Sequence, residues 1–80
     1  MILDKNQNEV KIGSKVKVLS IDPLYIASFP NDEAKIVQTM INKEFEVTDI
    51  EYGKPMVFQA FSNLSGIFLA LDSHEMELVK

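Results

Sequence analysis

The sequence of 80 residues contains no cysteine, no tryptophan and no arginine. Without cysteine it has no disulfide framework, no thiolate zinc site and no cysteine nucleophile. Without arginine it lacks the side chain that grips guanine or phosphate with two parallel hydrogen bonds. Twelve acidic residues oppose eight lysines, and the resulting net charge of −4 repels a polyanion. Nucleic-acid binding is therefore disfavoured from the start.

Long apolar segments are also missing. The longest apolar run, "GIFLAL", is far shorter than the ~20 residues that cross a bilayer. The first residues, "MILDKNQNEVK", lack the apolar core of a signal peptide. We therefore expect a cytoplasmic protein with no membrane segment. With 46% hydrophobic and 25% charged residues, we expect residues 1–80 to form one globular domain.

The first part of the chain predicts one strand and one helix. In "VKIGSKVKVLSID" apolar residues alternate with lysines around Gly13-Ser14, which is typical of a half-buried strand. Residues 1–9 are expected to be loose or to form a short edge strand. A helix is predicted over residues 32–41, with Asn31 as its N-cap and Asn42 left-handed beyond its end. It should cover part of the outer sheet surface with Val37, Met40 and Ile41.

The second part predicts three antiparallel strands and a short closing strand. "EFEVTDIE" has a bulge near Asp49, "YGKP" forms a hairpin turn at Gly53, and "MVFQAFS" and "IFLALD" flank a turn at "NLSG". "SHEM" predicts a single helical turn before "ELVK".

This order of elements resembles that of SH3-like barrels. "IGSKVKVLSID" is similar to the opening of many bacterial SH3-like domains, "INKEFEVTDIEYGKPMV" to their central hairpin, and "ALDSHEMELV" to their closing segment. Over residues 10–80 the chain resembles a small prokaryotic SH3-like family. The resemblance implies a mainly β, five-stranded small barrel with the helix inserted between strands 1 and 2. It implies no particular function, because this fold carries many.

Two departures from SH3-like relatives bear on function. The segment "DPLYIASF" and the absence of tryptophan do not fit the stacked-aromatic groove that binds polyproline. The long loop "IDPLYIASFPND" is neither basic nor rich in glycine, unlike the loops of ribosomal and transcription-factor relatives. Neither polyproline nor nucleic acid is the expected ligand.

The only histidine, His74, lies in the acidic stretch "LDSHEMELVK". A metal site needs three or four converging ligands, and one histidine without cysteine does not supply them. We expect instead that Asp72 or Ser73 caps a turn, that His74 is on the surface and that Met76 packs inward. No serine-nucleophile or phosphate-loop motif is present. We therefore assign no catalytic residue, metal ligand or cofactor.

Three functional hypotheses follow. The first is a non-catalytic interaction module that binds a protein partner or a second copy through aromatic surface. Its candidate residues are Tyr25 and Phe29 in the long loop, and Phe58 and Phe61 with Phe68 on the strands. Alternatively, these aromatics extend the core, or the loop pair staples the loop and helix to the barrel. The second is nucleic-acid binding through Lys11, Lys15 and Lys17, and the third a small metal- or ligand-binding enzyme around His74.

Overall fold

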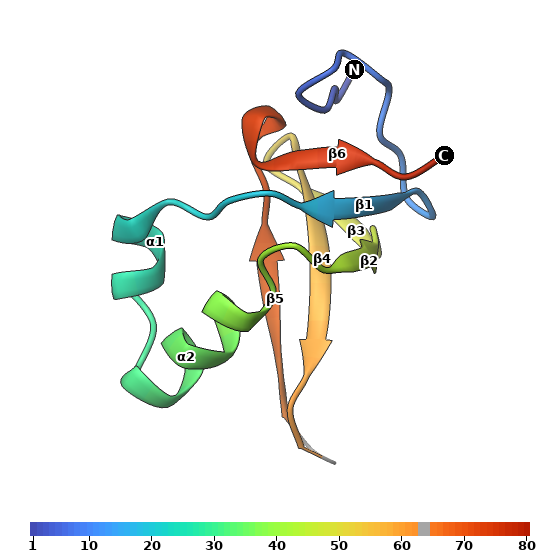
Figure 1. The fold of residues 1–80 in the computed structure, drawn as a ribbon. Coiled ribbons are helices and arrows are strands. Elements are labelled where there is room, and N and C mark those ends of the chain that lie inside the picture. Colours follow the sequence, from blue (N-terminus) through green and yellow to red (C-terminus); the bar gives the residue numbers. More distant parts are fainter. Residues whose placement is uncertain (63–64) are drawn as a thin grey trace.

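The computed structural model describes residues 1–62 and 65–80. Along the chain lie β1 (Lys15–Val18), α1 (Pro23–Ala27), α2 (Asn31–Thr39), β2 (Glu44–Glu46), β3 (Asp49–Glu51), β4 (Lys54–Ala60), β5 (Gly66–Ala70), the 3₁₀ turn η1 (Ser73–Glu75) and β6 (Met76–Leu78). The structure is mainly strands in two antiparallel sheets, ordered β2-β1-β6 and β3-β4-β5. The strands of one sheet run across those of the other, and both helices lie to one side of β5 (Figure 1).

The chain passes from one sheet to the other at Val47 and Thr48. The Val47 N–H donates to the Ser14 carbonyl at 2.7 Å, beside the first sheet, whereas the Thr48 N–H donates to the Met56 carbonyl of β4 at 3.0 Å. The predicted strand with a bulge near Asp49 is therefore two strands, one in each sheet. Residues 1–62 and 65–80 contain six strands, and the expectation of five is wrong for this reason.

The first strand is shorter than its alternating pattern predicts. Gly13 has a φ of 93°, and the Lys11 N–H donates to the Ser14 hydroxyl at 3.0 Å. These residues form a turn, and β1 begins only at Lys15. Ile12 is consequently exposed rather than part of the buried face.

The first nine residues are fastened to β6 rather than loose. Their centre is Asp4, a buried residue whose carboxylate accepts hydrogen bonds from the backbone N–H groups of Asn6 (2.9 Å), Asn8 (2.8 Å) and Leu78 (2.7 Å). Burial by itself raises the pKa of Asp4, but these hydrogen bonds outweigh it and lower the pKa below its ordinary value of 3.8. Within the segment, regular pairing is limited to one bridge between Leu3 and Glu9.

Two helices occupy the connection between β1 and β2. The first, α1, was not predicted from the sequence. Asp22 is its N-cap and accepts a hydrogen bond from the Leu24 N–H, and Pro23 takes the first helical position. The predicted helix over 32–41 runs instead from Asn31 to Thr39, and its N-cap is Pro30, which makes no side-chain capping bond. Asn42 has the predicted left-handed conformation, with a φ of 70°.

The core lies between the two sheets and includes side chains of α2. Val37 and Met40 are completely buried together with Val47 of the connection between the sheets and with strand residues of both sheets: Val16, Val18, Val57, Leu69 and Met76. The helix was predicted to cover part of the outer sheet surface with Val37, Met40 and Ile41; Val37 and the C-cap residue Met40 are part of the buried core, and Ile41 packs against it.

Two local turn predictions in the second half of the chain are confirmed. Tyr52 and Gly53 have φ values of 52° and 75°, as a two-residue hairpin turn requires. Asp72 caps η1 in a capping box with Glu75. The turn predicted at "NLSG" includes residues 63–64, which lie outside the described residues.

Candidate partner-binding surface

The sheet β3-β4-β5 has one buried and one exposed face. On β4 and β5 the odd-numbered residues Val57, Ile67 and Leu69 are buried, while the even-numbered Phe58 and Phe68 are exposed. The side of the sheet that carries Asp49, Glu51, Met56, Phe58 and Phe68 is called the outer face below. It is the side that points away from the core, as alternation along a strand requires.

Two aromatic side chains form the centre of the outer face. Phe58 and Phe68 lie directly opposite each other in the β4–β5 register, and their ring centroids are 4.8 Å apart. They remain 39% and 56% exposed, respectively. Such a cross-strand pair stabilises the sheet, yet much of its apolar area stays in contact with water.

Gly66 leaves the space that the Phe58 ring occupies. A Cβ atom built on Gly66 would overlap Cζ and Cε1 of that ring. The ring therefore covers the space that a side chain on the edge strand β5 would occupy.

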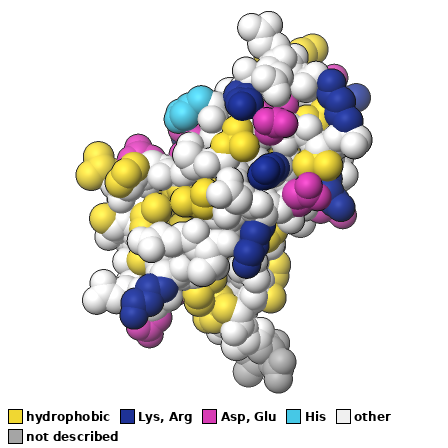
Figure 2. Space-filling view, viewed as in Figure 1, with side chains coloured by type: hydrophobic (Ala, Val, Ile, Leu, Met, Phe, Trp, Pro, Cys, Tyr) yellow, Lys and Arg dark blue, Asp and Glu magenta, His cyan; other side chains and the backbone are white. Residues whose placement is uncertain are grey.

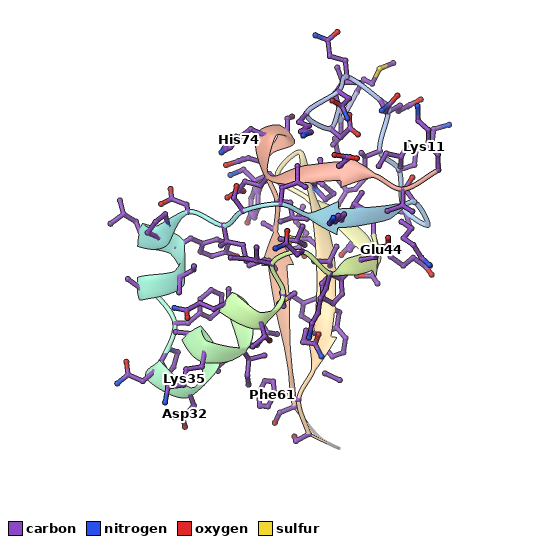
Figure 3. All side chains as sticks on the ribbon, in the orientation of Figure 1. Lys11, Asp32, Lys35, Glu44, Phe61 and His74 are labelled. Carbon is purple, nitrogen blue, oxygen red and sulfur yellow. The ribbon has the colours of Figure 1, made fainter. Side chains whose placement is uncertain are left out.

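Phe61 does not belong to the outer face. Phe61 comes directly after β4. Side chains alternate along a strand, so Phe61 points to the same side of the sheet as Val57 and Gln59 and to the side opposite Phe58. Figure 3 shows its ring near the far end of the β4–β5 hairpin, on the side toward α2. Phe61 is 41% exposed, but the structure does not join it to Phe58 and Phe68 as one patch.

Tyr25 and Phe29 form a separate, half-buried pair. Their ring centroids are 5.3 Å apart, and both residues pack against the buried core. The Ala70 N–H donates to the Tyr25 hydroxyl at 3.4 Å. This arrangement favours the interpretation that the pair staples the long connection to the sheets.

The outer face also carries two carboxylates that were not predicted from the sequence as site residues. Asp49 and Glu51 are exposed on the edge strand β3. Together with Met56 and Phe68 they line a hollow of about 170 Å³. The sequence signal that could have identified these two acids is the alternation in "DIE" just before a hairpin, because it places both acids on the same face as Met56.

The lysine nearest to this rim is already paired. Lys54 lies opposite Glu51 in the β3–β4 register, but its Nζ is 2.9 Å from a carboxylate oxygen of Asp72. The hydrogen bond and the charge of Asp72 raise the pKa of Lys54. Within the described residues, neither Asp49 nor Glu51 has an ion-pair partner.

The three lysines of the nucleic-acid hypothesis lie among glutamates. Lys15 is opposite Glu46, and Lys17 lies between Glu44 and Glu77 in the register of β2-β1-β6. Lys11 is 3.7 Å from Glu9. Figure 2 shows basic and acidic side chains interleaved over this side of the molecule. This geometry does not favour phosphate binding, which needs an excess of positive charge.

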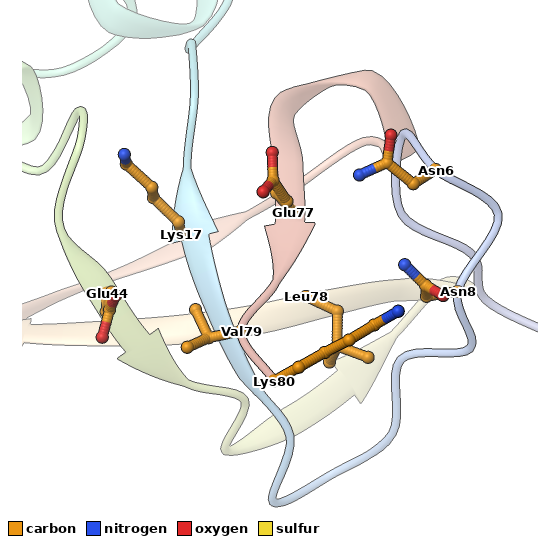
Figure 4. Close-up of a pocket in the computed structure, with 8 residues that line it drawn as sticks. All are labelled: Asn6, Asn8, Lys17, Glu44, Glu77, Leu78, Val79 and Lys80. Atoms are coloured by element: carbon orange, nitrogen blue, oxygen red, sulfur yellow. The ribbon is translucent and has the colours of Figure 1, made fainter.

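A groove crosses this lysine-bearing sheet. Its volume is about 640 Å³, and its polar lining comprises Asn6, Asn8, Lys17, Glu44, Glu77 and Lys80. Figure 4 shows these side chains spread along the groove on several separate segments. The lining combines charges of both signs, and it indicates no single class of ligand.

His74 lies on the surface, and Met76 is buried, as predicted. The neighbouring Glu75 is buried, and its carboxylate accepts hydrogen bonds from backbone N–H groups. In residues 1–62 and 65–80, no group of three or more histidine, cysteine, aspartate or glutamate side chains is placed to hold a metal ion.

Comparisons of the chain with protein-family models, with curated proteins and with solved structures gave no match. Among the described residues, no helix has the length and apolar character needed to span a bilayer.

Proposed function

We propose that the chain is a non-catalytic protein-interaction module built on an SH3-like small barrel, and that it binds its partner through the outer face. The barrel proposal is supported by the order of elements and by the passage of the chain between sheets at Val47 and Thr48. Two further features support the barrel proposal: the 3₁₀ turn η1 precedes the last strand, and that strand, β6, pairs with β1.

The observation that carries the functional proposal is the exposed Phe58–Phe68 pair. Both rings stand side by side on an exposed sheet face while smaller aliphatic side chains of the same strands are fully buried. Exposed apolar area is unfavourable by about 25 cal/mol per Å². Contiguous aromatic surface with a polar rim is typical of protein-binding sites.

The test is affinity capture from lysate of the source cells with three forms of the protein. A Phe58→Ser, Phe68→Ser variant removes the outer-face pair. A Phe61→Ser variant is the matched control, because Phe61 is as exposed as Phe58 but lies on the opposite side of the sheet. We expect one partner to be retained by the wild type and by Phe61→Ser and to be lost by the double variant.

Circular dichroism establishes that each variant is folded. A partner that the folded double variant still retains would contradict the proposal. A partner lost only with Phe61→Ser would place the interaction on the side of the hairpin toward α2 instead.

A further inference from the structure

We infer that the partner presents a segment in which an arginine or lysine is flanked by apolar residues, and that this cation enters the hollow between Asp49, Glu51, Met56 and Phe68. The inference rests on the proposed function and names the chemistry of the partner. It follows from the size of the hollow, its charge and its apolar floor.

The size of the hollow favours a single side chain. At about 170 Å³ it is smaller than the ~300–1,000 Å³ of sites that enclose a small-molecule ligand. A hollow of this volume is large enough for one long side chain that extends from a bound segment. The rest of that segment would then lie over Phe68, which lines the hollow, and over Phe58, which is opposite Phe68 on the same face.

The charge of the hollow favours a cation. Asp49 and Glu51 project from one side of β3, and in the part of the chain that the structure describes no lysine pairs with either of them. Lys54 lies opposite Glu51 in the register, but its Nζ is 2.9 Å from a carboxylate oxygen of Asp72, and so it does not neutralise Glu51. The negative charge on β3 is therefore free to attract a basic group of the partner.

The apolar floor favours a cation on a long stem. Arginine and lysine bury their methylene groups along apolar surface while the charged end stays near polar groups. Met56 and Phe68 supply that surface, and the Phe68 ring can also attract a cation over its face. Arginine is the better fit, because its planar guanidinium stacks on a ring and binds carboxylates at two points.

The same charges disfavour a second copy that docks through this face. In a two-fold dimer the same surface of each copy faces the other. The acids of β3 would then face a surface that carries the same acids. The outer face thus fits a different, basic chain better than itself.

The test is a titration of isotope-labelled protein with three short synthetic peptides, followed by NMR. One alternates leucine and arginine, the second replaces arginine by glutamate, and the third replaces leucine by serine. We expect the leucine–arginine peptide to bind and to shift resonances of Asp49, Glu51, Met56 and Phe68. The other two peptides should bind at least about tenfold more weakly, which corresponds to ~1.4 kcal/mol.

Two matched variants isolate the role of the hollow. Asp49→Asn, Glu51→Gln removes two charges at alternate positions of β3, and Glu44→Gln, Glu46→Gln removes two at alternate positions of β2. The β3 variant should weaken binding of the leucine–arginine peptide about tenfold, while the β2 variant should stay close to wild type. Equal weakening by both variants would indicate general charge attraction and would overturn the inference.

Other outcomes also decide the question. Shifts of the same residues with spermine at matched charge would indicate a site for free polyamines and would overturn the assignment to a protein segment. Binding of no peptide, while the Phe58→Ser, Phe68→Ser variant still loses its captured partner, would overturn the inference and leave the proposed function standing. A captured partner that does not depend on these phenylalanines would instead refute the proposed function itself.

Discussion

The carboxylate of Glu75 accepts a hydrogen bond from the backbone N–H of Asp22, 53 positions away, at 2.9 Å. Its second oxygen accepts from the N–H of Asp72, also at 2.9 Å. Glu75 is 3% exposed, so these bonds lie where water does not replace them. One side chain thus joins the start of α1 to the turn before β6.

Glu75→Ala should therefore destabilise the fold. It leaves two backbone N–H groups without their acceptor, and each unsatisfied group costs about 1–3 kcal/mol. The unfolding free energy, measured by urea titration, should fall by about 2–4 kcal/mol. Glu77→Ala is the control, because the Glu77 side chain is 42% exposed and pairs with Lys5 at 3.5 Å on the surface. Similar losses for the two variants would contradict the role assigned to Glu75.

Asp4 should make stability depend on pH in the acid range. Its pKa is lowered in the folded state, so the folded protein holds the carboxylate more favourably than the unfolded chain does. The stabilisation is fully present above the ordinary pKa of 3.8 that the unfolded chain has, and it is lost as the pH falls through the lower folded value.

An Asp4→Asn variant tests this pH dependence. Below about pH 4 its unfolding free energy should fall less steeply with acid than that of the wild type, and at neutral pH it should be less stable. Thermal melts at a series of pH values measure both effects. The control is Glu46→Gln on the exposed strand β2. If the unfolding free energy of Asp4→Asn falls below pH 4 as steeply as that of the wild type, Asp4 does not contribute to the acid destabilisation.

Gly66 and Phe58 should be energetically coupled. A Cβ at position 66 would overlap the Phe58 ring and lie 3.1 Å from the Gln59 carbonyl oxygen. Gly66→Ala should therefore displace the ring and destabilise the protein by about 1–3 kcal/mol. In a Phe58→Ala background the same change should cost less, with a coupling energy of about 0.5–3 kcal/mol. Additive losses across the four proteins would show that the ring and the glycine are independent.

Elements determined by local signals were the ones that the sequence predicted well. The turn at Gly53 and the capped turn at Asp72 depend on nearby residues, and both are present. Asn42 is left-handed for the same local reason. The start of α1 was missed, because "DP" after a strand marks both a strand end and a helix N-terminus with proline at its first position.

Features that depend on distant contacts were not predictable in the same way. Nothing in "EFEVTDIE" shows that Val47 bonds toward Ser14 while Thr48 bonds toward Met56. The acidic stretch "LDSHEMELVK" did not mark Glu75 as buried, and only the approach of Asp22 makes it a buried acceptor. For the candidate surface, the prediction that Phe58 and Phe61 act together neglected alternation along the strand, which places them on opposite sides of the sheet.

Tyr25 and Phe29 should affect stability rather than binding. Both pack against the core and each other, so Tyr25→Ala and Phe29→Ala should each destabilise the protein by about 2–4 kcal/mol. In a domain of this size, that corresponds to a fall in Tm of at least about 8 °C. The Phe58→Ser, Phe68→Ser variant should instead lose the partner, and its fall in Tm per substituted residue should be smaller than that of Tyr25→Ala or Phe29→Ala. A Phe29→Ala variant that keeps the wild-type Tm but loses the captured partner would move the binding surface from the outer face to the long connection.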